Sequence, residues 1–332
     1  MKLNELGEFG FIERISPDHI PRPSHVVRGI GDDCAVIRTG DPDLYLITTD
    51  LLIEGIHFTR KTIDPRRLGR KSISVNLSDI AAMGGVPRDA FVAIAVPENL
   101  DVEFLDAFYE GIHERTQEFQ VNILGGDTTS SLRDFMISIT LTGTCPDSQV
   151  IFRNTARPGD HIFLTGPVGD SAAGLDILLN RPEYDLTGRN SLIHSHLDPY
   201  PHIEQGRWIA QSGCAHAMID VSDGVSADLG HICDESSVGC TINSHALPLS
   251  DGLREYCLAL KKDPLDFALS GGEDYVLLCT GDPALLNSAH SSDMELFDIG
   301  IIEESRERFI RNSHGMKYPF QSRGWDHFSG SP

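Results

Sequence analysis

Acidic residues recur beside glycine, serine or threonine at the ends of short apolar segments of this sequence. The first case is GIGDDCAV at residues 29–36, and the pattern returns in LITTDLL, NLSDIAAMGG, LGGDTTSS, IDVSDGVS and SGGEDY. Burial of an unpaired carboxylate costs several kcal/mol. Two carboxylates about 4 Å apart also repel each other by roughly 4 kcal/mol at an effective dielectric constant of ~20. If these loops converge, only cations relieve the repulsion.

These segments offer oxygen ligands and no histidine or cysteine at zinc-ligand spacing, so the predicted cation is hard, Mg²⁺ or Ca²⁺. The D-x-[DN]-x-[DN]-G calcium loop is absent, and DVSDG at 220–224 resembles only its start. Mg²⁺ commonly combines a few carboxylates with phosphates, and glycines let backbone N–H groups approach phosphates closely. We therefore predict a metal site for a nucleotide. Walker, protein-kinase and G-x-G-x-x-G motifs are absent, so the predicted phosphoryl chemistry depends on metal ions.

Asp79 is the acid whose position most favours a function. An Asp at a strand end can simply cap the next helix or make a turn. Asp79 instead lies inside a helix predicted over 64–85, on one face with Asn76 and Ser72. Aspartate is a poor helix former at such a position and caps nothing there.

The elements around these residues predict an α/β chain of the α+β type with two domains. Turn residues at both ends of 145–160 predict a boundary there, which gives domains of residues 1–148 and 149–332. In the first domain we expect a strand followed by a turn over 44–58, and strands over 91–97, 121–127 and 135–145. We expect helices over 64–85 and 101–120. The second α/β series comprises 161–179, 216–236, 267–280 and 295–305.

Length and composition narrow the class of protein. A chain of 332 residues is long for one core, which favours two domains. The net charge of −22 argues against a nucleic-acid surface. No stretch of 18 apolar residues occurs and the N-terminus is unlike a signal peptide, so we expect no membrane association and a cytoplasmic location. The seven cysteines form no CxxC pair and are expected to be reduced, buried thiols.

Taken in order, GIGDDCAV, TTDLLIEGIHF, NLSDIAAMGG, GGDTTSS, GPVGDSAAG, DVSDGVSADLGHI, SGGEDY and GWDHF resemble the thiamine-monophosphate kinase family over nearly the whole chain. That family belongs to the aminoimidazole-ribonucleotide-synthetase-like superfamily of ATP-dependent enzymes. The resemblance implies an N-terminal α/β domain that binds ATP and Mg²⁺ and pairs with its twin in a homodimer. It implies a C-terminal α/β domain that completes the site. The implied reaction converts ATP and thiamine monophosphate into ADP and thiamine diphosphate.

The resemblance also assigns roles to residues. The implied metal ligands are Asp33, Thr48, Thr49, Asp50, Asp79, Asp127, Asp220 and Asp223. Those that would act in catalysis, through several Mg²⁺ ions, are Asp33, Asp50, Asp79, Asp127 and Asp220. The implied ATP contacts are Tyr109, Gly126, Asp127, Arg153 and Ser222, and the implied contacts to thiamine monophosphate are His57, Glu273 and Trp325.

The chemistry of the acceptor agrees with such a site. A phosphate monoester has a second pKa near 6 and is largely a dianion at neutral pH. This nucleophile needs no general base, but it needs relief from repulsion by the ATP phosphates, which metal ions supply. We therefore predict direct in-line transfer without a phosphoenzyme.

Each single residue also has a plainer explanation. His57 could bond to the backbone at a strand end, Arg153 could form a surface ion pair, and Trp325 could pack in the core rather than stack on a substrate ring. Glu273 could be a turn acid, although two preceding glycines favour close approach to a ligand. Asp274 is expected to be structural.

Two further features have an open role. The Gly-rich turn at 166–174 either grips a phosphate or packs a strand tightly against a helix, and Asp170 is left out of the site. Alternation from Asp33 would aim Asp32 at the opposite face, where it would support the loop or the metal shell.

Other enzymes of the superfamily fit less well. A selenophosphate synthetase needs a reactive cysteine in a Gly-rich N-terminal segment, whereas Cys34 lies in a predicted strand. The hydrogenase-maturation dehydratase acts through a C-terminal cysteine, whereas this sequence ends SGSP. Aminoimidazole ribonucleotide synthetase is the main alternative, disfavoured by TTDLLIEGIHF and GWDHF. A non-catalytic cation-binding scaffold would bind metal without sensitivity to nucleotide.

Overall fold

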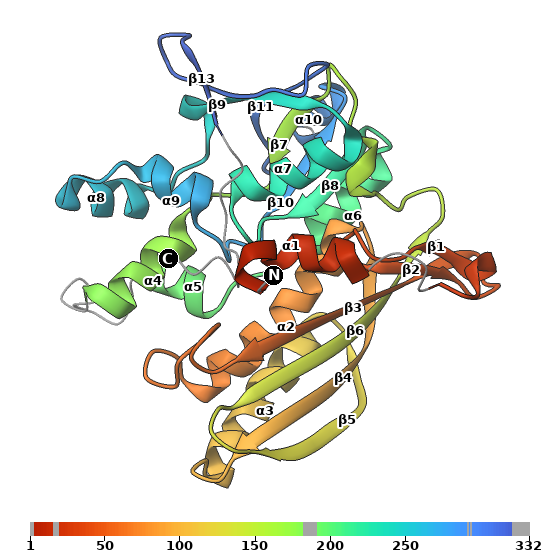
Figure 1. Ribbon diagram of the computed structural model, residues 1–332, viewed down its shortest axis with the longest axis vertical. Helices are drawn as coiled ribbons and strands as arrows, with labels where there is room; N and C mark the ends of the chain where they lie inside the picture. Colours follow the sequence, from red (N-terminus) through yellow and green to blue (C-terminus); the bar gives the residue numbers. More distant parts are fainter. Residues whose placement is uncertain (1–2, 16–19, 182–190, 291, 293, 321–332) are drawn as a thin grey trace.

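Two mixed β-sheets organise the chain (Figure 1). The computed structural model describes residues 3–15, 20–181, 191–290, 292 and 294–320. The elements of the first half are α1 (Leu3–Ile15), β1 (Val26–Arg28), β2 (Ala35–Arg38), β3 (Asp43–Ile53), α2 (Pro65–Ala82), β4 (Val86–Pro97), α3 (Val102–Glu118), β5 (Asn122–Ser131) and β6 (Met136–Pro146).

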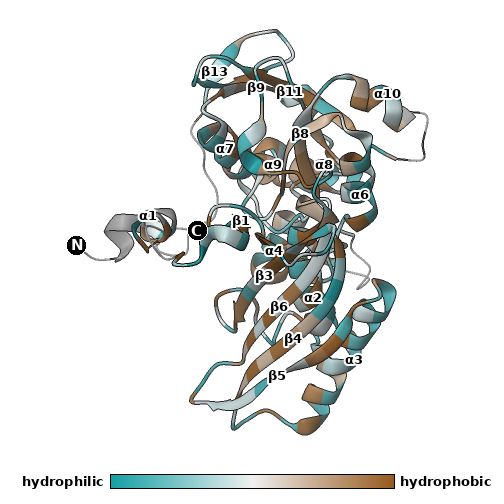
Figure 2. Ribbon diagram, turned by 90° about the vertical axis from the view of Figure 1, so that its right-hand side faces the viewer, coloured by the Kyte–Doolittle hydropathy of each residue, from teal (hydrophilic) through white to brown (hydrophobic). Residues whose placement is uncertain are grey.

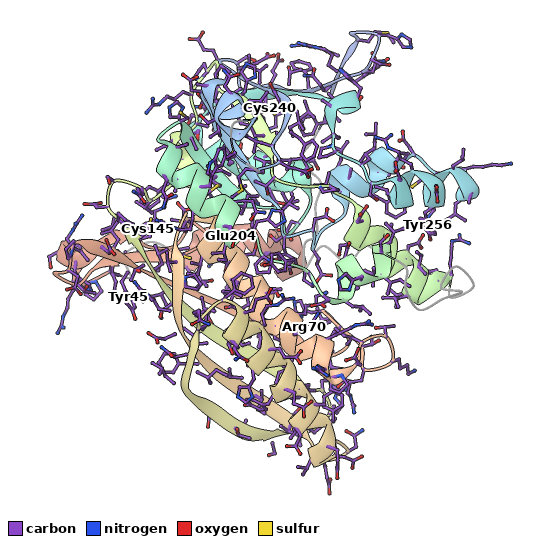
Figure 3. The ribbon with its side chains drawn as sticks, turned by 180° about the vertical axis from the view of Figure 1, so that it is seen from behind. Tyr45, Arg70, Cys145, Glu204, Cys240 and Tyr256 are labelled. Atoms are coloured by element: carbon purple, nitrogen blue, oxygen red, sulfur yellow. The ribbon has the colours of Figure 1, made fainter. Side chains whose placement is uncertain are left out.

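The first sheet has the order β1-β2-β3-β6-β4-β5, and its pairs are antiparallel except β4 with β5. Helices α2 and α3 cover one face, as the front and rear views agree (Figures 1 and 3). Strand alternation sends Leu44, Leu46 and Leu52 into the core beneath the helices. The opposite face keeps Leu51 52% and Phe91 43% exposed. Helix α1 projects on the side of this uncovered face (Figure 2).

Helix α2 begins and ends where the sequence predicts. The Asp64 side chain accepts a hydrogen bond from the Arg67 N–H, and Pro65 occupies the first turn, where its missing N–H costs nothing. Beyond the end, Gly84 adopts a φ of +68°, a conformation that glycine enters without strain. Thirteen of the helix's residues are buried, so α2 is a central helix that both halves of the protein pack against.

Helices α2 and α3 cross at a reciprocal pair of glycines. A Cβ atom on Gly111 would lie 1.9 Å from the carbonyl oxygen of Arg66, and one on Gly69 would lie 2.0 Å from that of Phe108. Each glycine therefore admits the backbone of the other helix, and this contact fixes where α2 lies beneath the sheet.

We expect the Gly111→Ala variant to lose about 3 kcal/mol of unfolding free energy, because overpacking against rigid backbone outweighs the ~1 kcal/mol gain in helix propensity. Urea unfolding measures the loss. Gly252→Ala in a helix of the second half is the control, since its nearest new contact is the Ser191 hydroxyl at 3.3 Å. Equal stability of the two variants would contradict the packing argument.

The second half repeats the α/β pattern. Its helices are α4 (Asp170–Asn180), α5 (Ser191–Leu197), α6 (Ile203–Ser212), α7 (Val225–Ser236), α8 (Asp251–Leu260), α9 (Pro264–Ser270) and α10 (Ala284–His290). Its strands are β7 (His161–Leu164), β8 (Ala215–Asp220), β9 (Gly239–Asn243), β10 (Leu277–Gly281), β11 (Phe297–Glu303), β12 (Arg308–Arg311) and β13 (Lys317–Pro319). Along β7, Ile162 and Leu164 enter one hydrophobic cluster while Phe163 joins the cluster shared with the first half. The second sheet, ordered β13-β12-β9-β11-β7-β10-β8, is therefore buried on both faces at its centre.

The expected α/β fold class is confirmed. The prediction of reduced cysteines is also confirmed, since all seven are free and six are buried. One detail was wrong, because β2 begins at Ala35 and Cys34 lies in the bend before it. Within the described ranges, the helices lack the length and apolarity that a membrane crossing requires.

Candidate functional site

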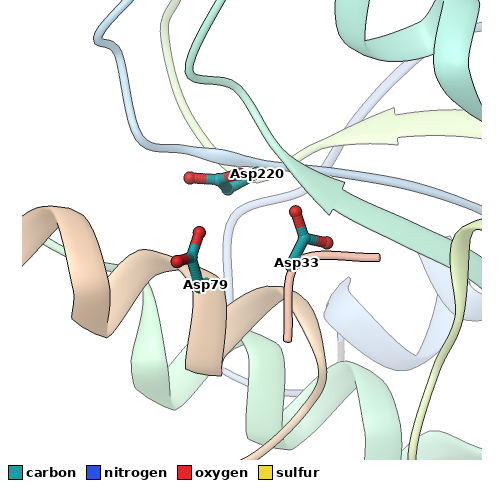
Figure 4. Close-up of side chains that lie close together, drawn as sticks. All are labelled: Asp33, Asp79 and Asp220. Carbon is teal, nitrogen blue, oxygen red and sulfur yellow. The ribbon is translucent and has the colours of Figure 1, made fainter. Parts of the chain in front are cut away.

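Three aspartates from separate elements meet between the two halves (Figure 4). Asp33 comes from the bend before β2, Asp79 from the last turn of α2, and Asp220 from the last position of β8. One carboxylate oxygen from each lies within 4.8 Å of the others, and Asp33 and Asp220 are buried. The acids that the sequence singled out at three distant positions therefore form one cluster.

The electrostatics of this cluster require a proton or a cation. Burial, and then the neighbouring Asp50, Asp220 and Asp33, raise the pKa of Asp79 well above its usual value. Burial and Asp33 raise the pKa of Asp220 to about 8. The three groups therefore resist simultaneous ionisation at neutral pH.

The donor set fits a hard divalent cation. Among the described residues, Asp33 Oδ2 is buried and lacks a hydrogen-bond partner, so an acceptor atom is left over in the cluster. Carboxylate oxygens at this spacing are ligands that Mg²⁺ accepts.

Hydroxyl groups hold two of the carboxylates in place. Thr48 Oγ1 on β3 donates to Asp79, and Ser78 Oγ donates to Asp220 Oδ2 at 2.7 Å. Asp50 follows Thr48 on the same face of β3, opposite the buried Ile139, and burial raises its pKa to about 6. Thr48 and Asp50 therefore border the cluster.

Arg153 lies beside the adjacent aspartates Asp32 and Asp33. Its guanidinium pairs with Asp33, and its Nε lies 3.9 Å from Asp32 Oδ1. Asp32 also pairs with Arg28 at 3.1 Å and accepts from the Asp33 N–H. The expectation that Asp32 and Asp33 face opposite ways was wrong, because residues 31–34 form a bend rather than a strand.

A loop carrying Ser222 and Asp223 connects β8 to α7. Asp228 in the first turn of α7 accepts from the backbone N–H groups of Asp223 and Gly224 at 3.2 and 3.0 Å. This carboxylate ties the loop to the first turn of α7.

Glu273 lies in an unusual backbone conformation beside this loop. Its φ is +64°, and its N–H donates to the Ser222 carbonyl at 2.7 Å. Its carboxylate pairs with the buried Lys71 at 3.0 Å and with His196 at 3.2 Å. Burial raises the pKa of Glu273, but Lys71 and His196 oppose it and bring the pKa below its ordinary value.

The two glycines before Glu273 approach protein rather than ligand. A Cβ on Gly272 would lie 2.4 Å from the Ser222 carbonyl oxygen, so the glycine allows two loops of this chain to touch. The contact with Ser222 is enough to explain a glycine at position 272, without close approach to a ligand.

Asp274 caps the helix that follows the 166–174 turn. Its two carboxylate oxygens accept from Gly169 N at 2.7 Å and Ser171 N at 3.2 Å, which confirms its structural role. These N–H groups at the start of α4 are occupied, and a Cβ on Gly169 would meet the Ala268 backbone nitrogen at 2.8 Å. The geometry favours tight packing over phosphate binding at this turn. Asp170, the first residue of α4, accepts a hydrogen bond from the Ser250 hydroxyl at 2.7 Å.

His57 and Tyr109 are held by their own elements. The Ile53 N–H donates to His57 Nδ1 at 3.0 Å, which places the proton of the neutral ring on Nε2. On α3, the Tyr109 ring packs edge-on against Phe108 at 5.5 Å.

Three predicted residues lie away from the cluster in a single chain. Thr49 faces the uncovered side of the sheet, where it accepts a hydrogen bond from Thr140. Asp127 lies on the edge strand β5, where it pairs with Ala93 of β4. Strand β5 is three strand spacings from β3, or about 14 Å. Gly126 admits the Val92 carbonyl, which a Cβ would meet at 1.7 Å. Their binding roles stay predictions, and Trp325 lies outside the described residues.

Sequence reasoning missed several members of the site. Ser78, Asp228, Lys71, His196 and Tyr275 all contact or border residues that it named. A lysine and three serines among the apolar residues of α2 were the available signal, because a buried lysine requires a partner.

Two family models match most of the chain. Residues 31–145 match the family model "AIR synthase related protein, N-terminal domain", and residues 157–311 match the corresponding C-terminal domain model. Thiamine-monophosphate kinase of Aquifex aeolicus is 37% identical over 328 residues, covering 99% of this chain and 100% of the relative. The chain belongs to the thiamine-monophosphate kinase family.

Other members of the family agree. Thiamine-monophosphate kinase of Escherichia coli strain K12 is 36% identical, with 97% of this chain and 98% of the relative covered. A solved structure of AaThiL complexed with AMPPCP and TMP superposes with a TM-score of 0.87 at 36% identity, covering 98% of this chain and 99% of that one. The family resemblance read from the sequence motifs is thus confirmed over nearly the full length.

Proposed function

We propose that this chain transfers the γ-phosphoryl group of ATP to thiamine monophosphate, giving thiamine diphosphate and ADP. The cluster of Asp33, Asp79 and Asp220 carries the proposal, because three carboxylate oxygens at this spacing suit a divalent cation that could bind phosphates. The close relatives support the substrate: they are thiamine-monophosphate kinases, and AaThiL has been solved with AMPPCP and TMP.

Mg²⁺ bound at this cluster would neutralise charge on the transferring phosphoryl group. The protein's part is to hold the ligands: Thr48 orients Asp79, and Ser78 orients Asp220. Arg153, already against Asp33, is suited to a phosphate oxygen at the edge of the cluster. Asp223 and Ser222 lie on the loop that Asp228 ties to α7, so ligand oxygens there are held rigidly.

Transfer is proposed to be direct. The acceptor phosphate is itself the nucleophile, and the described site offers carboxylates already required for metal rather than a free residue for phosphorylation. After mixing with γ-labelled ATP alone, the protein should carry no label.

The test of the reaction is ADP release from Mg-ATP with and without thiamine monophosphate, followed by chromatography of thiamine diphosphate. Dependence of ADP release on thiamine monophosphate supports the proposal. Equal ADP release without it would refute the substrate while leaving an ATP-dependent enzyme of the superfamily.

We further propose that two copies pair through the uncovered face of the first sheet. Exposed apolar residues Leu51, Phe91 and Val86 lie on this face, and an area of this kind favours burial against a partner. Asp127 faces the same side from the edge strand, so a second copy would bring it toward a site that it cannot reach within its own chain.

The Leu51→Glu/Phe91→Glu variant should be monomeric in size-exclusion chromatography with light scattering, because it would bury two charges in the interface. The Leu258→Glu variant is the control, since Leu258 is 80% exposed on α8 in the second half. A double variant that remains dimeric would contradict this interface.

A further inference from the structure

Lys71 is a charged residue in an environment that excludes water. It lies on α2 with 1% of its surface exposed, and lysine is almost never buried to this degree without a partner. Its Nζ donates to the His196 carbonyl oxygen at 3.0 Å and lies 3.0 Å from Glu273 Oε1. Lys71 therefore links a central helix to the loop that carries Glu273.

The carboxylate of Glu273 is held at both oxygens. Oε1 faces Lys71, and Oε2 lies 3.2 Å from His196 Nδ1. Burial lowers the pKa of His196 to about 4, so this ring is neutral at pH 7. Its Nδ1 lies between Glu273 Oε2 and the Ser171 hydroxyl oxygen, which is 3.1 Å away, so Ser171 holds the ring beside the carboxylate. Two different partners on the two oxygens fix the plane of the carboxylate, which a single partner would leave free to rotate.

The backbone of Glu273 is fixed as well. A non-glycine residue at a φ of +64° costs free energy, and the hydrogen bond to Ser222 maintains it. The side chain nevertheless keeps 27% of its surface exposed. An ionised carboxylate offers about four acceptor positions, so positions remain for a donor from a ligand.

We propose that Lys71 is a positioning residue for substrate selection: with His196 it orients the Glu273 carboxylate to accept a hydrogen bond from the amino group on the pyrimidine ring of thiamine monophosphate. This inference rests on the proposed function. The amino group follows from chemistry, because Glu273 can only accept and that group is the N–H donor of the substrate. Lys71 itself contacts Glu273 rather than the substrate.

The test compares thiamine monophosphate with oxythiamine monophosphate, in which an oxo group replaces the amino group. The wild-type chain should favour the amino compound by at least about tenfold in kcat/KM, because a site built for a donor rejects an analogue that lacks it. Lys71→Met should raise KM for thiamine monophosphate about tenfold and leave KM for ATP within about twofold, so that this preference is lost.

A double-mutant cycle separates positioning from general damage. Since Lys71 acts through Glu273, the Lys71→Met/Glu273→Gln variant should be no worse than Glu273→Gln alone. The Arg70→Met variant is the matched control: Arg70 is adjacent on α2 but pairs with Asp198 and Glu114 (Figure 3). It should lower the melting temperature without changing the preference for the amino compound.

If Lys71→Met fails to fold, His196→Leu removes the other partner while Lys71 stays, and it should show the same loss of preference and the same non-additivity with Glu273→Gln. The inference is overturned if the variants that fold keep the preference, or if their effects add to that of Glu273→Gln. Wild-type protein without turnover of thiamine monophosphate would instead refute the proposed function and this inference with it.

Discussion

The Asp79→Asn variant is expected to lose phosphoryl transfer by about 10³-fold or more, because it removes a proposed metal ligand from the acidic cluster. At the same time its unfolding free energy without divalent cations should rise by about 1 kcal/mol or more. The reason is that burial and three neighbouring carboxylates disfavour ionised Asp79, and each pKa unit of that penalty corresponds to about 1.4 kcal/mol. Inactivation with stabilisation is the signature of a site whose residues are arranged for a cation rather than for the fold.

Two measurements check this result. Steady-state ADP release gives the activity, and thermal melts with and without Mg²⁺ give the stability and its dependence on metal. Asp64→Asn on the same helix is the control, since asparagine caps a helix as well as aspartate does and Asp64 lies outside the site. An Asp79→Asn protein that is both active and still stabilised by Mg²⁺ would contradict the metal site.

Stability without divalent cations should fall as the pH rises from 7 to 8.5. Burial raises the pKa of Asp220 and of Asp274 to about 8 and that of Asp32 to about 7. In the unfolded chain these groups ionise near pH 4, so over this range the folded state binds more protons and loses stability with increasing pH. The slope approaches about 1.4 kcal/mol per pH unit for each group that is still protonated.

Between pH 7 and 8.5 the buried histidines do not change the free energy of unfolding. Burial lowers the pKa values of His196, His202 and His231 to about 4, so their effect increases stability with pH and is complete near pH 7. Mg²⁺ should restore more stability at pH 8.5 than at pH 7, since it binds ionised ligands. Urea midpoints at both pH values, with and without Mg²⁺, measure the difference. A pH-independent midpoint without metal would show that the cluster is not strained by its charges.

The sequence predicted those parts of the molecule that local chemistry determines. Asp64 and Gly84 mark the ends of α2 by capping and by positive φ, and both are short-range effects. Asp33, Asp79 and Asp220 were recognisable because each breaks a local rule, standing as an acid inside or directly beside an apolar element. From the sequence, their convergence was only a condition, and the fold brings these three together.

The parts that could not be predicted depend on which distant segments meet. Asp274 caps α4 at Gly169, 105 positions earlier, and the choice of that partner is made by the fold. Lys71 looks like an ordinary helical lysine until α5 covers it. The order of the strands could not be predicted either. Because β6 and β4 lie between β3 and β5, Asp127 lies far from Asp50, although both follow the same sequence pattern.

Three consecutive residues of one loop have unrelated partners. Glu273 pairs with Lys71, Asp274 caps α4, and the Tyr275 N–H donates to the Val221 carbonyl oxygen beside Asp220 of the acidic cluster. An insertion or deletion there would shift all three contacts at once. Evolution or engineering of a new phosphate acceptor on this scaffold is therefore restricted to exchanging side chains one at a time at constant loop length. Lineages that diverge in substrate should keep this length even where their residues differ.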